Sequence, residues 1–447
     1  MTAEVSDTIA AIATPAGRGS IGIVRVSGPR AFAIAEAIIG ELPAPRQAVY
    51  RRFLDGEGRD IDRGLAIGFP APHSFTGEDV LELQGHGGSV VMDLLLSRVI
   101  ALGARPARPG EFSERAFLND RIDLAQAEAI ADLIDSRSAQ AARSAMHSLD
   151  GEFSREIRAL VDTVIELRVH VEAALDFPDE DIDFLDDPRI RDQLLDLIAR
   201  TATVRRAARQ GSLLREGLRI VIAGRPNAGK STLLNRLAGD DAAIVSHIPG
   251  TTRDVLQRDI LLDGVPVRVT DTAGLRESLD PVEREGVRRA WREIGSADLV
   301  LLLIDATTGY GNSEAGIEAD LPPGIPMLRL WNKIDLDGAI PPPGKGELGL
   351  SAFTGEGVGD LRRRIAELTG ASGTGEGVYL ARRRHLTDLD RAISALENAE
   401  AQYRNNRAGE LLAEELRTAQ HALREITGEF TSEDLLGRIF SSFCIGK

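Results

Sequence analysis

The chain contains very little cysteine and very little lysine. Cys444 is the single cysteine among 447 residues, which excludes an internal disulfide and any metal site built from several cysteines. Only four of the 53 basic residues are lysines, namely Lys230, Lys333, Lys345 and Lys447. Because arginine is so strongly preferred, a position that keeps lysine is a candidate for a role that needs a compact ammonium group. Lys345 follows three prolines in a loop and carries no such indication.

Long apolar runs are also missing. No stretch approaches the roughly 20 residues that a membrane span needs, and residues 1–10 lack the basic and apolar segments of a secretory signal. Hydrophobic and charged contents of 43% and 27% are those of an ordinary globular protein. We therefore expect a cytoplasmic protein of about three domains, with no membrane partner.

Positive charge is in deficit. The chain has 69 acidic and 53 basic residues, for a net charge of −16. Such a surface repels polyphosphates, so a nucleic-acid substrate would need a local basic patch or the help of a partner protein.

The apolar pattern changes character along the chain. Strands predicted at 21–26 and 80–84 alternate with helices predicted at 31–39 and 89–102, which indicates an α+β domain over residues 1–120. Helical spacing follows, with Leu124, Ala127, Ile130, Ala131 and Ile134 on one face. We assign residues 121–215 and 373–447 to one all-α helical domain, and residues 216–372, where strands and helices alternate, to an inserted α/β domain.

A phosphate-binding loop lies near the start of the inserted domain. Gly224–Ser231 reads Gly-Arg-Pro-Asn-Ala-Gly-Lys-Ser, after an apolar strand at 219–223 and before a helix at 232–237. In this arrangement the backbone N–H groups surround the phosphates, Lys230 reaches the β and γ oxygens, and Ser231 binds Mg²⁺. The domain is therefore predicted to be a Ras-like P-loop G domain.

Two further segments fit the γ-phosphate and Mg²⁺ side of such a site. Asp271-Thr272-Ala273-Gly274 follows a strand at 265–270, so that the aspartate would hold Mg²⁺ through water and the Gly274 amide would sense the γ-phosphate. Upstream, Thr252 is the expected second hydroxyl ligand of Mg²⁺.

The base-recognition motif is Asn332-Lys333-Ile334-Asp335, which follows an apolar run at 327–330. An aspartate at position 335 accepts both guanine N1–H and N2–H, which adenine does not offer. Lys333 lays its alkyl stem along the base, and Ser351-Ala352-Phe353 would complete the pocket with backbone N–H groups. Four motifs in this order predict GTP binding.

The residues expected to catalyse hydrolysis differ from those of Ras-like proteins. Leu275 occupies the place where Ras-like proteins carry a water-orienting glutamine. The downstream acids Glu277, Asp280, Glu283 and Glu285 are candidates for that role, although each alone reads as a solvated charge. No arginine finger is identifiable by position, and Asn227 could instead ligate a monovalent cation or simply tolerate a left-handed backbone.

These motifs, together with segments outside the G domain, resemble the MnmE (TrmE) family of GTPases that modify the wobble uridine of certain tRNAs. The similarity runs along the whole chain, and the segments that carry it outside the G domain are Thr8–Ala10, Ala13–Pro15, Gly17–Gly19, Ser74–Asp79, Leu83–Gly88, Pro109–Phe112, Leu118–Asp120, Asp123–Ala129 and Phe443–Lys447.

The resemblance implies the chemistry of the G domain. It implies K⁺ bound by Asn227, Ser246, Ile248 and Thr251, and it makes Glu283 the residue that orients the hydrolytic water. The expected catalytic residues are thus Glu283, Asn227 and Lys230. The expected GTP-binding residues are Asn227, Ala228, Gly229, Lys230, Ser231, Thr232, Ser246, His247, Ile248, Pro249, Gly250, Thr251, Thr252, Asp271, Thr272, Ala273, Gly274, Asn332, Lys333, Asp335, Ser351, Ala352 and Phe353.

The resemblance also implies a tetrahydrofolate derivative, either 5,10-methylene or 5-formyl, in the N-terminal dimerisation domain. Its contacts map onto Arg25, Glu82, Arg121 and Lys447, and position 121 departs from the lysine often found there. A homodimer would act with a FAD-dependent partner of the MnmG type on carbon 5 of U34 in tRNA.

Two alternatives stay open. Cys444 is either a residue with a chemical role or an inert thiol. The competing function is a regulatory or ribosome-assembly GTPase switch without modification chemistry. A KH-like RNA-binding module, with its Gly-x-x-Gly clamp, would favour that switch, and we find no such module after the G domain.

Overall fold

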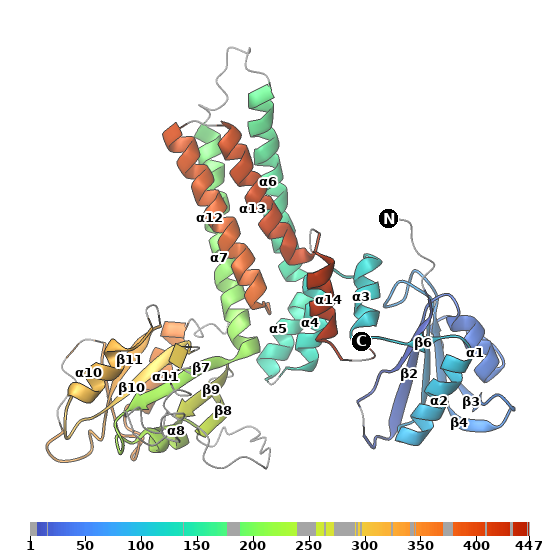
Figure 1. The fold of residues 1–447 in the computed structure, drawn as a ribbon, viewed down its shortest axis with the longest axis horizontal. Coiled ribbons are helices and arrows are strands. Elements are labelled where there is room, and N and C mark those ends of the chain that lie inside the picture. Colours follow the sequence, from blue (N-terminus) through green and yellow to red (C-terminus); the bar gives the residue numbers. More distant parts are fainter. Residues whose placement is uncertain are drawn as a thin grey trace. The chain divides into compact units, whose positions relative to one another are not determined.

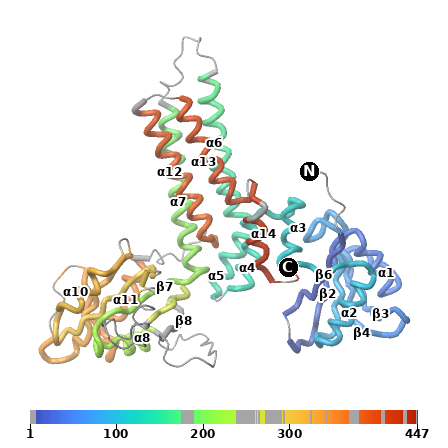
Figure 2. Tube along the Cα trace, viewed as in Figure 1, coloured from blue at the N-terminus to red at the C-terminus, as the bar shows by residue number. Residues whose placement is uncertain are grey.

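The computed structural model describes most of the chain (Figures 1 and 2). The described residues are 7–15, 17–136, 138–176, 188–238, 256–262, 265–271, 291, 294–295, 297–322, 325–339, 344, 346–369, 379–406, 409–429, 432–444 and 446. They form two compact units, of which the first comprises 1–131, 148–194 and 394–447 and the second 132–147 and 195–393.

The N-terminal part of the first unit is a six-stranded sheet with strand order β3-β4-β5-β2-β1-β6. Its strands are β1 (Ile9–Ile12), β2 (Ile21–Ser27), β3 (Val49–Leu54), β4 (Asp60–Phe69), β5 (Val80–His86) and β6 (Arg105–Pro106). Helices α1 (Ala31–Ile39) and α2 (Ser89–Ala101) pack on the sheet. The α+β prediction for this region is confirmed.

Side-chain alternation gives the sheet two different faces. Val24 and Leu83 point into the core under α1 and α2, so residues 25 and 82 point to the opposite face because successive side chains of a strand alternate. On that opposite face, Ile9 and Ala11 pack with Phe112 of α3 (Glu111–Leu118). This second face carries the polar residues discussed below.

The helices follow the spacing expected from the sequence. They are α4 (Leu124–Ile134), α5 (Ala139–Leu149), α6 (Glu152–Asp176), α7 (Pro188–Glu216), α12 (Arg383–Asn406), α13 (Gly409–Thr427) and α14 (Glu433–Ser441). In the first unit α6 packs along α13, and α14 packs on α3. Helices α7 and α12 run antiparallel, because Arg191 pairs with Glu400 while Arg205 pairs with Asp390. Among the described residues, no helix is long and apolar enough to cross a bilayer.

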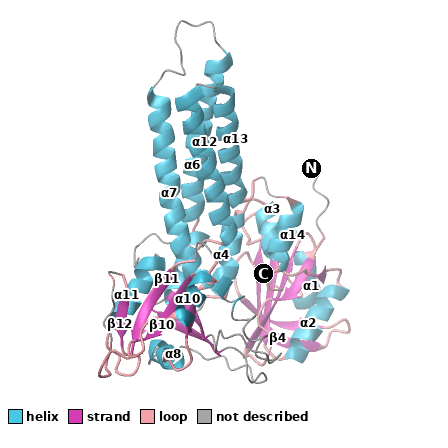
Figure 3. Ribbon diagram, turned by 60° about the vertical axis from the view of Figure 1, so that its left-hand side comes forward, coloured by secondary structure: helices cyan, strands magenta, loops and turns pink. Residues whose placement is uncertain are grey.

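The second unit contains a six-stranded sheet with strand order β12-β11-β10-β7-β9-β8 (Figure 3). Its strands are β7 (Leu218–Gly224), β8 (Leu256–Leu262), β9 (Val265–Asp271), β10 (Leu299–Asp305), β11 (Met327–Asn332) and β12 (Leu348–Leu350). Only β8 is antiparallel to its neighbour. Helices α8 (Lys230–Ala238) and α11 (Val358–Thr369) bury apolar residues on one face of the sheet, and α10 (Asn312–Ala319) on the other.

This topology brings functional segments to one edge. Parallel strands covered on both faces read as continuous apolar runs, as in β10, where Leu299–Ile304 are all buried. Ligands of such sheets bind beyond the carboxyl ends of the strands. The phosphate loop follows β7, and the base motif begins at the last residue of β11, so both lie at that edge.

Candidate functional site

The phosphate loop connects β7 directly to α8. Asn227 has φ of 65° and Gly229 has φ of 99°, both in the left-handed region. A Cβ on Gly229 would lie 2.2 Å from Nδ2 of Asn332, so only glycine fits this position. Lys230 is 7% exposed, and its ammonium donates to the carbonyls of Gly224 at 3.0 Å and Arg225 at 2.9 Å. The lysine is thus held against its own loop.

The loop is also anchored from outside. The guanidinium of Arg225 lies 2.5 Å from the carboxylate of Glu314, whose side chain is 1% exposed. The same carboxylate accepts the backbone N–H of Gly311 at 3.1 Å, at the start of α10. The sequence analysis missed Glu314, since a single acid at a helix start carries no nucleotide signature. The pair stabilises the phosphate loop and directs Arg225 toward α10.

Asn332 joins three parts of the site that are distant in sequence. Its Nδ2 donates to the carbonyl of Ala228 at 2.7 Å, and its Oδ1 accepts the N–H of Ala352 at 2.9 Å. Arg236 of α8 donates to the carbonyls of Ala352 and Phe353. The phosphate loop, the base motif and the 351–353 loop therefore form one hydrogen-bonded assembly.

Lys333 is oriented by an acid at the end of the neighbouring strand. Its Nζ lies 2.6 Å from Oδ2 of Asp305, and Thr307 donates to the other carboxylate oxygen. Burial raises the pKa of Asp305, but the hydrogen bonds from Lys333 and Thr307 outweigh it, so the pKa lies below its usual value. Asp335 is exposed, which leaves its carboxylate accessible to a base.

Several predicted site residues lie outside the described part of the chain. They are Ser246, His247, Ile248, Pro249, Gly250, Thr251, Thr252, Thr272, Ala273, Gly274, Leu275, Glu283 and Lys447, as well as the side chain of Asp271. Ser231 and Thr232 lie in the first turn of α8. The structure brings together the base motif, the phosphate loop and the 351–353 loop. The roles of the expected Mg²⁺ and K⁺ ligands stay predictions.

A second group of predicted residues meets on the open face of the N-terminal sheet. Arg25 and Glu82 are register partners on β2 and β5, with 2.9 Å between guanidinium and carboxylate. Arg25 also donates to the carbonyl of Gly446 at 3.3 Å and lies over the ring of Phe112. Arg121 is exposed. Gly446 therefore lies beside the ion pair formed by two of the four residues predicted to contact folate.

The C-terminal segment is held in place by packing. Phe440 and Phe443 bury their rings with Leu124 and Ala127, and Gly110 N–H donates to the carbonyl of Cys444 at 3.4 Å. Gly446 has φ of 94°, and a Cβ there would lie 2.6 Å from the carbonyl oxygen of Ile12. The thiol of Cys444 is exposed. Gly446 is a further residue that the sequence analysis did not single out.

Comparison with known proteins decides the family. The profile of the MnmE helical domain matches residues 124–444, and that of the GTP-binding protein TrmE N-terminus matches residues 8–121. The chain is 59% identical to the tRNA modification GTPase MnmE of Sodalis glossinidius and 58% identical to that of Erwinia tasmaniensis, each over 99% of both chains. The chain belongs to the MnmE family.

Membership makes the chain a GTP hydrolase that acts in tRNA modification. The predicted architecture is confirmed as well: family models match the N-terminal TrmE domain and the helical domain, and the parallel sheet with its phosphate loop is the G domain of a GTPase.

Similar solved structures include Era of Aquifex aeolicus, at 26% identity over 40% of this chain and 66% of Era, and the G domain of FeoB of T. maritima, at 24% identity over 34% and 98%. Their TM-scores of 0.29 and 0.28 carry no argument about function.

Proposed function

We propose that this MnmE-family GTPase modifies carbon 5 of the wobble uridine, U34, of certain tRNAs together with a FAD-dependent partner of the MnmG type. The observation that carries the proposal is the identity of 59% over 99% of both chains with a tRNA modification GTPase. The functional unit is a cytoplasmic homodimer that joins its partner in a heterotetramer or a larger complex.

A tetrahydrofolate derivative, 5,10-methylene or 5-formyl, supplies the one-carbon unit when bound. The position of Arg25 supports this part of the proposal, because folates carry carboxylates and guanidinium groups bind carboxylates in a two-pronged geometry. Glu82 offers an acceptor to ring N–H groups on the same face, and Arg121 and Lys447 complete the proposed contacts. Cys444 is exposed two residues from Gly446, which suits a thiol that takes part in the chemistry.

In the G domain, Ser231 and Thr252 hold Mg²⁺, while Asn227, Ser246, Ile248 and Thr251 hold K⁺. Asn227 fits this role because its side chain is exposed at the tip of the phosphate loop. Oxygen ligands suit both hard cations. Glu283 positions the hydrolytic water where Leu275 offers no polar group, and GTP binding brings two G domains together.

Mass spectrometry of U34 in tRNA from cells lacking this chain tests the proposal. Loss of the aminomethyl-type modification at carbon 5, restored by re-expression, is the expected result. Unchanged U34 together with altered ribosome profiles would favour the alternative, a ribosome-assembly switch without modification chemistry. Variants of Arg25 and Asn227 in the same strain separate the folate and K⁺ parts of the proposal.

A further inference from the structure

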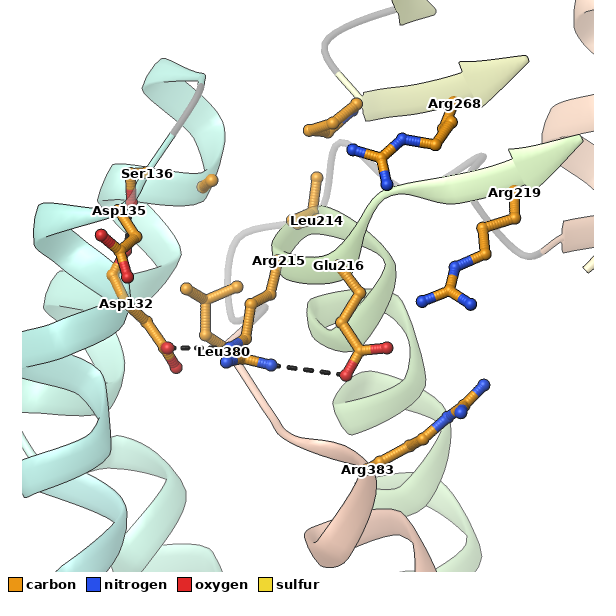
Figure 4. A pocket seen from close by; sticks show the side chains of 12 residues that line it. Asp132, Asp135, Ser136, Leu214, Arg215, Glu216, Arg219, Arg268, Leu380 and Arg383 are labelled. Carbon is orange, nitrogen blue, oxygen red and sulfur yellow. Dashed lines mark hydrogen bonds and ion pairs between the residues drawn. The ribbon is translucent and has the colours of Figure 1, made fainter. Parts of the chain in front are cut away.

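A cavity of about 810 Å³ lies in the second unit, away from the nucleotide site (Figure 4). It is lined by the ends of α4 and α7, by α5, by the start of α12 and by the first residues of β7 and β9. Arg219 is the second residue of β7 and Gly224 is the last, so the cavity and the phosphate loop are roughly 16 Å apart along this strand. The cavity therefore lies at the amino ends of the parallel strands, opposite the nucleotide edge.

The cavity has more arginines than carboxylates. Asp132, 6% exposed, accepts from Arg215 at 2.7 Å and from Arg382 at 2.8 Å, so one buried carboxylate holds two guanidinium groups. Glu216 also pairs with Arg215, at 3.3 Å. With Arg219, Arg268 and Arg383, four arginines and three carboxylates are found among the described lining residues, the third carboxylate being Asp135.

Two of these arginines sit side by side. Arg219 and Arg268 are register partners on the parallel strands β7 and β9. Within the described residues, the guanidinium groups of Arg219 and Arg383 have no hydrogen-bond or ion-pair partner, and Figure 4 shows both side chains on the same side as Glu216, opposite Asp132 and Asp135.

We propose that this arginine cavity binds phosphate groups of the RNA backbone. Guanidinium groups are the preferred side chains for phosphate because their planar donors match its oxygens. In a chain of net charge −16, a local excess of arginine also supplies the basic patch that an RNA needs for docking. Among the described lining residues there is no aromatic side chain to serve as a stacking platform for bases, which favours recognition of the backbone.

The inference rests on the role of the chain in tRNA modification. Its test is the binding of a tRNA transcript to the full-length chain, measured by fluorescence anisotropy over a range of KCl concentrations. The variant is Arg219→Ala with Arg383→Ala. Each lost phosphate contact should reduce the magnitude of the slope of log affinity against log salt by about one. The double variant should therefore show a slope smaller in magnitude by about two, and it should bind tRNA at least tenfold more weakly at low salt.

Matched controls keep the result interpretable. Arg363→Ala with Arg364→Ala removes the same charge from exposed, carboxylate-paired positions on α11 and should leave the slope unchanged. Arg219→Lys with Arg383→Lys should retain most of the slope, since the charge is kept. GTP turnover without tRNA and thermal unfolding should match the wild type in the alanine double variant.

Wild-type affinity and slope in the alanine double variant would overturn the inference, as would an equal loss in the α11 control. Loss of inorganic pyrophosphate binding with unchanged tRNA binding would overturn it too, since the cavity would then be a small-anion site. Failure here leaves the proposed function untouched, because U34 modification in the deletion strain is measured independently.

Discussion

The Nδ2 of Asn332 lies 2.7 Å from the carbonyl oxygen of Ala228, so the base-recognition motif is hydrogen bonded directly to the phosphate loop. Asn332 is 2% exposed, and its Oδ1 accepts a second buried backbone group, the N–H of Ala352. The segments predicted to contact the base and the phosphates are thereby coupled through one amide.

Replacing this amide should cost both stability and nucleotide affinity. Asn332→Ala leaves two buried backbone groups without this partner, at about 1–3 kcal/mol for each unsatisfied group. We expect lower thermal stability without nucleotide and weaker GTP binding by calorimetry. Asp335→Ala is the matched control: an exposed side chain changes stability by about 0.5 kcal/mol or less, while guanine selectivity is lost. Equal unfolding temperatures for Asn332→Ala and wild type would contradict the coupling.

GTP turnover should be much faster in KCl than in NaCl. A cation held by Asn227 would supply transition-state charge in place of an arginine finger. Asn227→Ala should abolish the difference between the two salts while retaining GTP binding. Because Asn227 has φ of 65°, alanine there also strains the backbone; Asn227→Gly removes the amide without that strain and should behave alike. Equal wild-type rates in both salts would disprove the K⁺ assignment.

Glu283→Ala should lose hydrolysis and keep nucleotide affinity. A group that orients water acts in the transition state, so its loss lowers kcat without weakening ground-state binding. Single-turnover hydrolysis and GTP titration measure the two effects separately. Glu277→Ala is the control and should turn over normally. A dead Glu277→Ala variant beside an active Glu283→Ala variant would show that the other acid is the catalytic one.

Deleting residues 444–447 should eliminate U34 modification and leave GTP hydrolysis and folding intact. The deletion removes the carbonyl of Gly446 from Arg25, and with it the proposed contact of Lys447 to folate. Lys447→Ala should weaken folate binding in calorimetry more than it lowers thermal stability. Gly446→Ala keeps the chain length but places a Cβ 2.6 Å from the carbonyl oxygen of Ile12, so it should reproduce part of the loss of U34 modification. Wild-type modification by the truncated chain would show that the tail has no role.

Acid should destabilise the N-terminal sheet through Glu111. Its carboxylate, 3% exposed, lies 2.5 Å from Arg105. Burial raises the pKa of Glu111. The hydrogen bonds from Arg105 and from the Arg108 N–H lower this pKa by more than burial raises it, so the pKa lies below the ordinary value of 4.5. Since the folded-state pKa is depressed, this stabilisation is complete above about pH 4.5 and is lost as pH falls through the folded value.

The measurement for Glu111 is thermal unfolding as a function of pH. Glu111→Gln should lower stability at neutral pH and flatten the acid side of the profile. Glu57→Gln removes the same charge from an exposed loop and should leave the profile unchanged. A Glu111→Gln profile parallel to that of the wild type would contradict the assignment.

Local patterns were sufficient for much of this molecule. The strands at 21–26 and 80–84 and the helix at 31–39 form within one or two residues of their predicted bounds. The phosphate loop lies between β7 and α8 as its strand-loop-helix context predicts. The second part of the predicted helical domain, residues 373–447, is divided into α12, α13 and α14, because helical spacing alone does not mark where one helix ends and the next begins.

By itself, the sequence determined the order of the domains and the identity of the GTP motifs, because glycine, lysine and aspartate at fixed spacings report directly on phosphate and guanine chemistry. Only the tertiary structure decided which distant residues support them. Glu314 anchors Arg225, Asp305 orients Lys333, and the Gly446 carbonyl meets Arg25. Such pairs depend on sheet order and chain return, which no local pattern encodes. The arginine cavity likewise exists because β7 and β9 are neighbours and place Arg219 beside Arg268.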